Sequence, residues 1–447
     1  MTSLQLDRGD IVNMEQSLNI LILSSFPASH SANLCGDVMT ALEEAGHRVY
    51  FGYPGIEKLF AWRQNYKPKR YSLVRRIWNR LQWYYRRIFN IAYIEEHGYL
   101  ISPKGYVMFM PFEEKPNIPS SDILGKLNGP YDMVLFHFFE NMTTMSIVKA
   151  IDEKFHCPIV LVSPDMYPMT GGCYYFNHCR NFENECYDCP IFHSRDNLAH
   201  RNFIYKKQVY STTKTCFYGN TWMNSFAEKS KIFENAYIYN GSFILDEDVF
   251  KPLDRTECRK ELGILGDYDL VIFNRYKNMK RKGIEYFNRS MDIFLCDLSA
   301  DERKKILLVT IDQCDNRLSE RLGIEVVQFG RVDIHKLIEI YNASDLFLCS
   351  SVDDAGPSMI NQSIACGTPV VAFDTGTAID VVETGTSGYC AKYKDSNDLA
   401  AGLHYIYSMK KEEYEQLRLT TREMAIRKNS KKAFADSIRT IYKHFNH

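Results

Sequence analysis

The chain has 447 residues, of which 45% are hydrophobic and 24% are charged, and its formal net charge is −1. This composition is typical of a soluble globular protein, and the length favours two domains over a single core. The small net charge does not indicate nucleic-acid binding, no apolar run approaches the length of a membrane span, and no signal-peptide pattern opens the chain.

The first elements predict a parallel sheet. Residues 1–17 are polar and aperiodic, and we expect a flexible tail there. Asn19–Phe26 is a short, almost entirely apolar run, typical of a strand buried on both faces. Apolar residues then recur at helical spacing up to a terminating glycine: Leu34, Val38, Leu42, Ala45 and Gly46. Residues 48–54 read as a second strand, and this strand–helix–strand order indicates parallel pairing.

Residues 62–94 form a basic and aromatic arm with nine lysines and arginines and no acidic residue. Its apolar residues recur at helical spacing: Leu73, Ile77, Leu81, Tyr84, Ile88 and Ala92. This pattern predicts a basic amphipathic helix that binds an anionic membrane surface. The alternative is a helix packed on the rest of the N-terminal domain with a solvated basic face. Nucleic acid is disfavoured as a partner because nothing else in the chain is strongly basic.

Further buried strands are predicted at 131–139 and 157–165, and a cysteine cluster follows them. The cluster contains Cys173, Cys179, Cys186 and Cys189, with His178 and His193 as spare ligands. Four thiolates within seventeen residues, two of them in a C-x-x-C pair, predict one structural zinc site with no open position for catalysis. Free thiols, or disulfides in an oxidising compartment, stay open as alternatives. Without an export signal we expect a reducing cytoplasm.

A second series of strands and helices begins after residues 237–255, which look like a loop. Five buried strands are predicted at 269–274, 305–311, 325–330, 345–351 and 369–374. We therefore expect an α/β protein of two Rossmann-like domains that face each other across a cleft. The predicted limits are 18–239 for the N-terminal domain, 240–425 for the C-terminal domain, and 426–447 for a last helix that packs back on the N-terminal domain.

Residues 353–376 have the layout of a phosphate site. We expect a short helix at Pro357–Cys366, ended by Gly367. The free N–H groups at its start would belong to Gly356, Ser358 and Met359, and a helix N-terminus attracts phosphate. Pro357 has no N–H to offer and would occupy the first turn, where that lack costs nothing. An ordinary strand–helix turn is the alternative reading.

Two cations are predicted beside this helix. Arg275 and Lys282 follow the first strand of the same domain, where they would supply the positive charge that a diphosphate requires. Lys277 and Lys280 read instead as parts of a solvated loop.

The second half resembles the nucleotide-sugar domain of glycosyltransferase family 4, which has the GT-B fold. The matching stretches are "RKG" at 281–283, "VQFGRVD" at 327–333, "YNASDLFLCSS" at 341–351, "ACGTPVVAF" at 365–373 and "GTAIDVVETGTSGYCAKYKDSNDLAAGL" at 376–403. Weaker matches are "GHRV" at 46–49, "MYPMTGGC" at 166–173 and the "NG" and "FKP" landmarks between 240 and 252. Within the family the cysteine segment is most similar to enzymes that build bacterial surface glycans of the colanic-acid type.

This resemblance implies a donor site and departs from the family in three places. The family carries two glutamates eight positions apart, which contact the donor sugar and the ribose; this chain has Asp354 and Gln362 there. A histidine of the family is replaced by Pro164, with Asp165 beside it. His137 resembles another histidine of the cleft, although a strand-end histidine without a catalytic role is the alternative. We expect a retuned site, because a neutral hydrogen bond in place of a charged one costs about 1 kcal/mol.

The resemblance implies a retaining glycosyltransferase that uses a nucleoside diphosphate sugar without a catalytic divalent metal. Arg275 and Lys282 would stabilise the departing diphosphate, while Asp354, His137 and Asp165 would contact the sugars. The acceptor would be a glycan on a lipid carrier, and the chain would lie in the cytoplasm on the inner face of the membrane. Two alternatives remain: a nucleotide-sugar-binding protein without turnover, and an enzyme with a protein or small-molecule acceptor.

Overall fold

A computed structural model describes residues 16–25, 35–53, 73–88, 93–94, 100–101, 109, 113–114, 118–137, 144–175, 179–191, 198–313, 315–356 and 358–446. Several sequence predictions lie outside the described residues. They concern the tail up to residue 15, the arm at 62–72 and 89–92, Pro357, and the spare zinc ligands His178 and His193.

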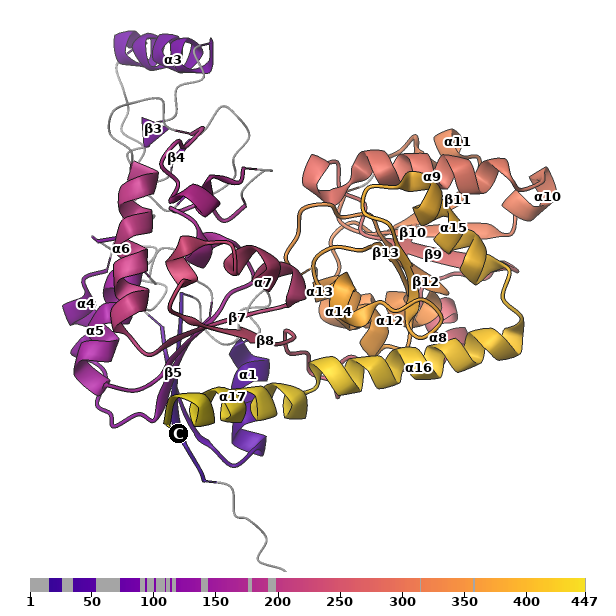
Figure 1. The fold of residues 1–447 in the computed structure, drawn as a ribbon. Helices are drawn as coiled ribbons and strands as arrows, with labels where there is room; N and C mark the ends of the chain where they lie inside the picture. The colour runs from indigo at the N-terminus through magenta and orange to yellow at the C-terminus, as the bar shows by residue number, and fades with distance from the viewer. Residues whose placement is uncertain are drawn as a thin grey trace, which may run out of the picture.

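Two parallel six-stranded sheets form the two lobes of the molecule (Figure 1). In the N-terminal sheet the strand order is β2 (Arg48–Gly52), β1 (Asn19–Ser24), β5 (Met133–His137), β6 (Ile159–Val162), β7 (Thr215–Gly219) and β8 (Tyr237–Asn240). In the C-terminal sheet the order is β11 (Glu325–Gln328), β10 (Ile306–Thr310), β9 (Leu270–Asn274), β12 (Leu346–Cys349), β13 (Val370–Phe373) and β14 (Gly388–Ala391). A short antiparallel pair joins β3 (Tyr93–Ile94) to β4 (Leu100–Ile101).

Helices alternate with these strands, as parallel pairing requires. In the N-terminal lobe they are α1 (Cys35–Glu44), α3 (Leu73–Ile88), α4 (Ser120–Leu124), α5 (Met145–Phe155), α6 (Leu198–Thr212) and α7 (Thr221–Ala227), with 3-10 turns η1 (Tyr167–Met169), η2 (Asn181–Asn184) and η3 (Lys231–Phe233). The chain then continues with α8 (Arg255–Glu261), η4 (Lys280–Lys282), α9 (Ile284–Cys296), α10 (Ala300–Arg303), α11 (Leu318–Leu322), α12 (Ile334–Ala343), α13 (Ser358–Ala365), α14 (Ala378–Val381), α15 (Ser396–Tyr407), α16 (Lys411–Asn429) and α17 (Lys431–Asn446).

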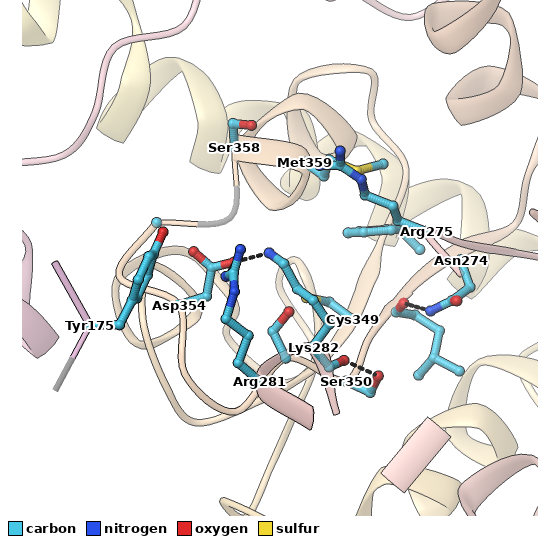
Figure 2. A pocket seen from close by; sticks show the side chains of 14 residues that line it. Tyr175, Asn274, Arg275, Arg281, Lys282, Cys349, Ser350, Asp354, Ser358 and Met359 are labelled. Atoms are coloured by element: carbon cyan, nitrogen blue, oxygen red, sulfur yellow. Dashed lines mark hydrogen bonds and ion pairs between the residues drawn. The ribbon is translucent and has the colours of Figure 1, made fainter. Parts of the chain in front are cut away.

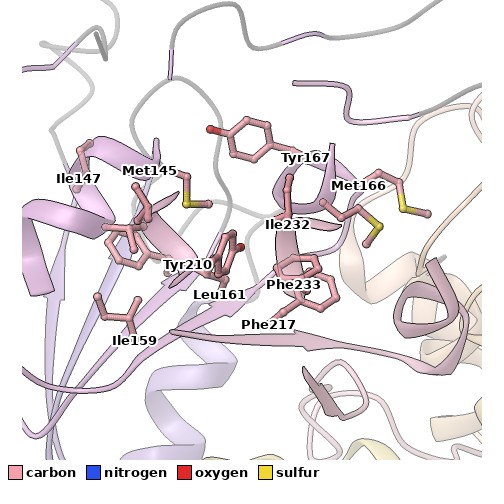
Figure 3. Packing of buried hydrophobic residues seen from close by; sticks show 14 of the residues in the cluster. Met145, Ile147, Ile159, Leu161, Met166, Tyr167, Tyr210, Phe217, Ile232 and Phe233 are labelled. Atoms are coloured by element: carbon pink, nitrogen blue, oxygen red, sulfur yellow. The ribbon is translucent and has the colours of Figure 1, made fainter. Parts of the chain in front are cut away.

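The central strands are buried on both faces, which explains their unbroken apolar sequences. All five residues of β5 and all five of β9 are buried. Figure 3 shows one face of the N-terminal sheet, where Met145 of α5 packs in the same cluster as Leu161 of β6 and Phe217 of β7. This packing fixes the positions at which each strand ends, and therefore the edge where side chains are presented to a ligand.

The last helix returns to the N-terminal lobe. Phe434 and Ile438 of α17 are buried in one cluster with Ile20 and Ile22 of β1. The Lys431 ammonium, at the start of α17, lies 2.9 Å from Oε1 of Glu44. In Figure 1 the long helix α16 leads from the C-terminal lobe to α17, so the two helices join the lobes. The domain limits given from the sequence nevertheless remain predictions.

The lobes also meet on the side of the sheets' carboxyl ends. Asn220, after β7, donates a hydrogen bond to the carbonyl oxygen of Ala355 at 2.6 Å. The backbone N–H of Thr221 donates to Oδ2 of Asp380 at 3.1 Å. These bonds bring the loop before α13 against the N-terminal lobe.

The predicted α/β class with two Rossmann-like sheets is confirmed. One prediction was wrong: residues 237–255 begin with strand β8 and not with a loop. The side chains of Tyr237, Ile238 and Tyr239 are half-buried, since β8 is the edge strand of its sheet. Without the unbroken apolar run of a central strand, such an element carries a weak sequence signal.

Candidate active site

A pocket lined by charged and polar side chains lies at the switch point of the C-terminal sheet. Counted along the domain, the strand order is 3-2-1-4-5-6, and it reverses between β9 and β12. Asn274 ends β9, and its side-chain amide donates to the carbonyl oxygen of Leu348 in β12 at 2.8 Å. Both residues line the pocket. In open α/β sheets a crevice at this position is the usual ligand site.

A tight turn presents the cation Lys282 to this pocket. Gly283 ends η4 with φ +68°, a left-handed conformation that favours glycine. A Cβ atom on Gly283 would lie 1.8 Å from the carbonyl oxygen of Ser350, so no other residue fits there without movement of the backbone. The Ser350 hydroxyl donates to the carbonyl oxygen of Lys282 at 3.0 Å. The "RKG" sequence is therefore explained by the packing of this turn on the end of β12.

Asp354 is the centre of a charged cluster in the pocket. Its Oδ2 forms an ion pair with the Lys282 ammonium and lies 3.6 Å from Nη1 of Arg281. Figure 2 shows these three side chains side by side, with Tyr175 at the edge of the pocket. Asp354 and its partners are largely but not fully buried, with side-chain exposures of 12% for Asp354, 16% for Lys282 and 25% for Arg281. One carboxylate is thus shared by two cations.

Among the described residues that line this pocket, Tyr175 comes from the N-terminal lobe. The guanidinium of Arg281 lies 4.7 Å from the centre of the Tyr175 ring, within the range of a cation–π contact. Burial, and then the nearby charge of Asp354, raises the pKa of Tyr175 to about 12. The phenol therefore stays protonated at neutral pH and is a hydrogen-bond donor.

Arg275 lines the same pocket from the end of β9 and is also ion-paired. Its Nε lies 2.5 Å from Oδ2 of Asp312, which follows β10. The Arg275 side chain is 40% exposed, so a ligand can reach it without opening the core. Both predicted cations, Arg275 and Lys282, are therefore present and each has a carboxylate partner.

The start of α13 forms another wall of the pocket. Gly356, Ser358 and Met359 line it, as expected for a helix N-terminus directed at a ligand. The helix ends at Ala365, and Gly367 has φ +72°, so the predicted helix and its glycine stop are confirmed. Gln362 does not line the pocket; its Oε1 accepts a hydrogen bond from the Tyr341 hydroxyl at 2.9 Å.

Two predicted residues of the N-terminal lobe are not brought to this pocket. His137, at the end of β5, is buried, and its Nδ1 lies 3.4 Å from Sγ of Cys35. Burial lowers the pKa of His137 to about 4, so the imidazole is neutral at pH 7. Asp165 is also buried, and its Oδ1 accepts the N–H of Tyr167 at 2.9 Å, which stabilises turn η1. Their roles in catalysis remain predictions.

The sequence did not predict three residues that lie in the pocket or contact its charged side chains. Arg281 was seen only as part of a motif, Asp312 lies in a different loop from its partner, and Tyr175 comes from the other lobe. Of these, only Arg281 carried a sequence signal, because it precedes Lys282 directly. The other two depend on contacts between segments far apart in the chain.

The cysteine cluster is brought together, but a metal centre is not formed by the side chains as they stand. Cys173, Cys179, Cys186 and Cys189 line one small cavity in the N-terminal lobe. Among the described residues, no three His, Cys, Asp or Glu side chains are arranged to hold a metal ion. The zinc prediction is therefore not confirmed by the observed geometry.

Comparison with known proteins identifies the C-terminal part. Residues 254–424 match the family described as "Glycosyl transferases group 1". The D-inositol 3-phosphate glycosyltransferase 2 of Catenulispora acidiphila is 26% identical over 172 residues, which are 36% of this chain and 40% of that protein. The chain spans less than half the length of the curated relatives it matches.

Solved structures extend the likeness to both lobes. The structural alignment with sucrose-phosphate synthase from Thermosynechococcus elongatus covers 96% of this chain and 99% of the synthase chain, with a TM-score of 0.58 and 14% identity. HepE of Anabaena, solved with UDP and glucose, covers 96% of this chain and 100% of its own, with a TM-score of 0.56 and 14% identity. Identity this low shows the fold alone, and the finer resemblance to family 4 and to colanic-acid enzymes stays a prediction. Residues 254–424 thus form a glycosyl transferases group 1 domain, in a chain whose two lobes have the GT-B fold.

Proposed function

We propose that this protein is a retaining glycosyltransferase that moves a sugar from a nucleoside diphosphate sugar to a glycan acceptor. The observation that carries the proposal is the charged pocket at the switch point of the group 1 domain, where Arg275, Arg281 and Lys282 surround one opening. Diphosphate is the donor group that requires several cations in one place.

In this proposal the diphosphate replaces protein carboxylates on the cations. Lys282 exchanges Asp354 for a phosphate oxygen, and Arg275 exchanges Asp312 for another. The cations then stabilise the negative charge that grows on the leaving diphosphate as the sugar bond breaks. The released Asp354 carboxylate accepts hydrogen bonds from hydroxyls of the donor sugar.

The acceptor hydroxyl loses its proton to the leaving phosphate, and it attacks from the face that this phosphate leaves. No separate base is needed in this scheme, which is consistent with Pro164 in place of the family's histidine. The N–H groups of Ser358 and Met359 bind the diphosphate. For Gln362 to bind the ribose, as the resemblance to family 4 implies, its amide must leave the Tyr341 hydroxyl and turn into the pocket. Uridine is the first base to test, since HepE of Anabaena was solved with UDP and with UDP-glucose.

Nucleotide binding tests the donor site directly. UDP, GDP, ADP and dTDP are each added to the protein, and the unfolding temperature is measured. We expect one nucleotide to raise it, and we expect Lys282→Ala to remove the shift. Lys280→Ala is the matched control, because Lys280 carries the same charge in the same turn, is exposed and does not line the pocket. Equal loss in both variants, or no shift with any nucleotide, would refute the proposed donor site.

A second candidate function is a nucleotide-sugar-binding protein without turnover. The specific observation in its favour is that Lys282 and Arg275 are already neutralised by Asp354 and Asp312. Slow hydrolysis of the bound nucleotide sugar, measured as released nucleoside diphosphate, separates the two functions. A transferase hydrolyses its donor at a rate that falls about 100-fold or more in Lys282→Ala. Binding without any release above background favours the second function.

The acceptor is proposed to be a lipid-linked glycan at an anionic membrane surface. In the described part of the chain, no helix is long and apolar enough to cross a membrane. Helix α3 is instead amphipathic, with five arginines and no acidic residue in its sixteen positions. Its described apolar side chains are exposed: Val74 77%, Ile77 53%, Trp78 60%, Leu81 57%, Tyr84 48%, Tyr85 56% and Ile88 71%.

These exposures argue against the alternative in which the apolar side of α3 packs on the N-terminal lobe. Figure 1 shows α3 at the far end of that lobe, away from both sheets. A membrane surface covers apolar side chains and attracts arginines at the same time, with about 1 kcal/mol for each basic residue near an anionic leaflet. This combination favours a lipid surface over a protein partner.

Flotation with lipid vesicles tests this part of the proposal. We expect the protein to float with vesicles that contain phosphatidylglycerol and to remain behind with pure phosphatidylcholine. Replacement of Arg75, Arg76, Arg86 and Arg87 by glutamate should abolish flotation and leave the nucleotide shift intact. Lack of binding to anionic vesicles by the unmodified protein would refute the membrane proposal and favour an acceptor in solution.

A further inference from the structure

The four cysteines of the cluster in the N-terminal lobe share one small cavity. Cys173, Cys179, Cys186 and Cys189 come from four positions in a segment whose described residues form one short 3-10 turn, η2, yet they line the same cavity. The cavity measures about 20 Å³, close to the minimum that holds a single water molecule. It has room for one ion and none for an organic group or an iron–sulfur cluster.

The backbone around the cysteines is arranged as it is around thiolate ligands. The N–H of Gly171 donates to Sγ of Cys186 at 3.3 Å, and the N–H of Asn181 donates to Sγ of Cys179 at 3.5 Å. Hydrogen bonds to the ligand atoms are the outer support that metal sites require. These two N–H groups already face two of the four sulfurs, where they would support the thiolates that form when a cation binds.

The chain also adopts an unfavourable conformation at this point. Glu185 and Cys186 both lie in the left-handed region, with φ of 57° and 52°. Each such residue other than glycine costs about 1–3 kcal/mol unless its surroundings impose it. This pair turns the chain so that Cys186 and Cys189 line the same cavity, which is what a C-x-x-C ligand pair requires.

None of the four cysteines is in a disulfide in the structure, so disulfides do not hold the loop. Four thiolates that line one small cavity would repel one another, so they can form together only with a cation to balance them.

We propose that Cys173, Cys179, Cys186 and Cys189 bind one zinc ion as a structural site. Four sulfur ligands in a tetrahedron are typical of zinc or of iron–sulfur clusters, and the small cavity leaves zinc. On binding, four thiols lose four protons, four Zn–S bonds form, and no electron is transferred. The described side chains as they stand do not form a metal site, so binding of the ion requires the sulfurs to move toward one another.

The site would anchor a segment that reaches the donor pocket. Tyr175 is two residues after Cys173, and its ring lies against Arg281 in the charged cluster. Before Cys173 the chain is already fixed, because the buried Lys206 ammonium donates to the carbonyl oxygens of Tyr167 and Thr170. Zinc would fix the other side. This consequence rests on the proposed function, whereas the zinc site itself does not.

Metal content is the decisive measurement, and it needs no activity assay. The full chain is expressed in medium with added zinc, passed through a desalting column, and analysed by mass spectrometry of its metals. We expect about one zinc per chain, and about one also in Cys296→Ser, the matched control, because Cys296 is an exposed cysteine of the other domain. In Cys186→Ser and in Cys189→Ser we expect a loss of zinc of about tenfold or more.

A variant that fails to fold would lose zinc for a trivial reason, so the unmodified protein is tested as well. Stepwise addition of a mercurial reagent should release one zinc as four thiols react. Growth with cobalt should give the intense visible absorption of tetrahedral cobalt bound to thiolates. Less than a tenth of a zinc per chain, with four thiols that react freely in the native protein, would overturn the proposal. Disulfides found by mass spectrometry of the unreduced protein would also overturn it.

Discussion

The negative charge of Asp354 lies where a bound diphosphate would also bring negative charge. The substitution Asp354→Asn keeps the shape of the side chain and removes that charge. If the donor must displace Asp354 from Lys282, the variant should bind UDP more tightly than the unmodified protein. Sugar transfer or donor hydrolysis should slow at the same time, because the variant lacks the carboxylate that we propose to contact the donor sugar.

The size of the effect follows from the geometry of the cluster. Two unit charges 3.6 Å apart, as for Arg281 Nη1 and Asp354 Oδ2, attract by about 4–5 kcal/mol at an effective dielectric constant of about 20. This value is an upper bound, since fully exposed pairs contribute only about 0–1 kcal/mol. The side chains here are 12% to 25% exposed. We therefore expect about 1–3 kcal/mol, which makes UDP bind about 5- to 150-fold more tightly.

Calorimetric titration of UDP into the two proteins measures this difference. The effect should shrink as salt is added, because both partners of the removed charge are partly exposed. Asp353→Asn is the matched control, since Asp353 is the adjacent acid and does not line the pocket. If Asp354→Asn weakens UDP binding as Lys282→Ala does, Asp354 supports the diphosphate site and the proposed exchange is wrong.

Three further predictions concern the scaffold. Gly283→Ala should lower the free energy of unfolding by about 2–4 kcal/mol, because a Cβ would meet the Ser350 carbonyl and φ is +68°. Urea unfolding measures this difference. A change below about 1 kcal/mol would contradict the packing of the turn. Phe434→Ala should lower the free energy of unfolding by about 3–5 kcal/mol in the same assay, since the ring is buried against the N-terminal sheet. If this loss is smaller than the loss for Leu419→Ala, whose side chain is exposed, α17 does not pack on the N-terminal lobe. The third prediction is a pH dependence from His137, whose folded pKa of about 4 is below the ordinary 6.5, so that the unfolded chain binds the proton first as the pH falls. The free energy of unfolding should therefore fall by up to about 3 kcal/mol between pH 6.5 and pH 4, compared with that of His137→Gln. If the free energies of the two proteins change in parallel with pH, the lowered pKa of His137 is refuted.

The sheets were predictable from the sequence because their central strands are buried on both faces. Runs such as Leu270–Asn274 are apolar throughout, and this signal depends on the residues themselves. The edge strand Tyr237–Asn240 lacked it, since its side chains are half-buried. Helix α1 was predictable for a related reason: its apolar residues recur at helical spacing, and Gly46, with φ +85°, follows its end.

The donor pocket was predictable only in part. Arg275, Lys282 and Asp354 follow strand ends, and the carboxyl ends of parallel strands meet at one edge of a sheet. Sequence position says nothing about which acid pairs with which cation. Tyr175 could not be assigned, because its contact with Arg281 depends on how the two lobes face each other.

The charges in the pocket explain why donor binding must rearrange it. Arg275, Arg281 and Lys282 supply three positive charges, and their partners Asp312 and Asp354 supply two negative ones, so the cluster has a net charge of +1. A diphosphate with one negative charge per phosphate adds about two negative charges. The five side chains and the ligand would together carry about −1 in a partly buried site, which is unfavourable. At least one carboxylate must therefore leave its cation. Asp354 competes most directly with the phosphates, because two cations hold it inside the pocket, whereas Asp312, which Arg275 would also exchange, does not line the pocket.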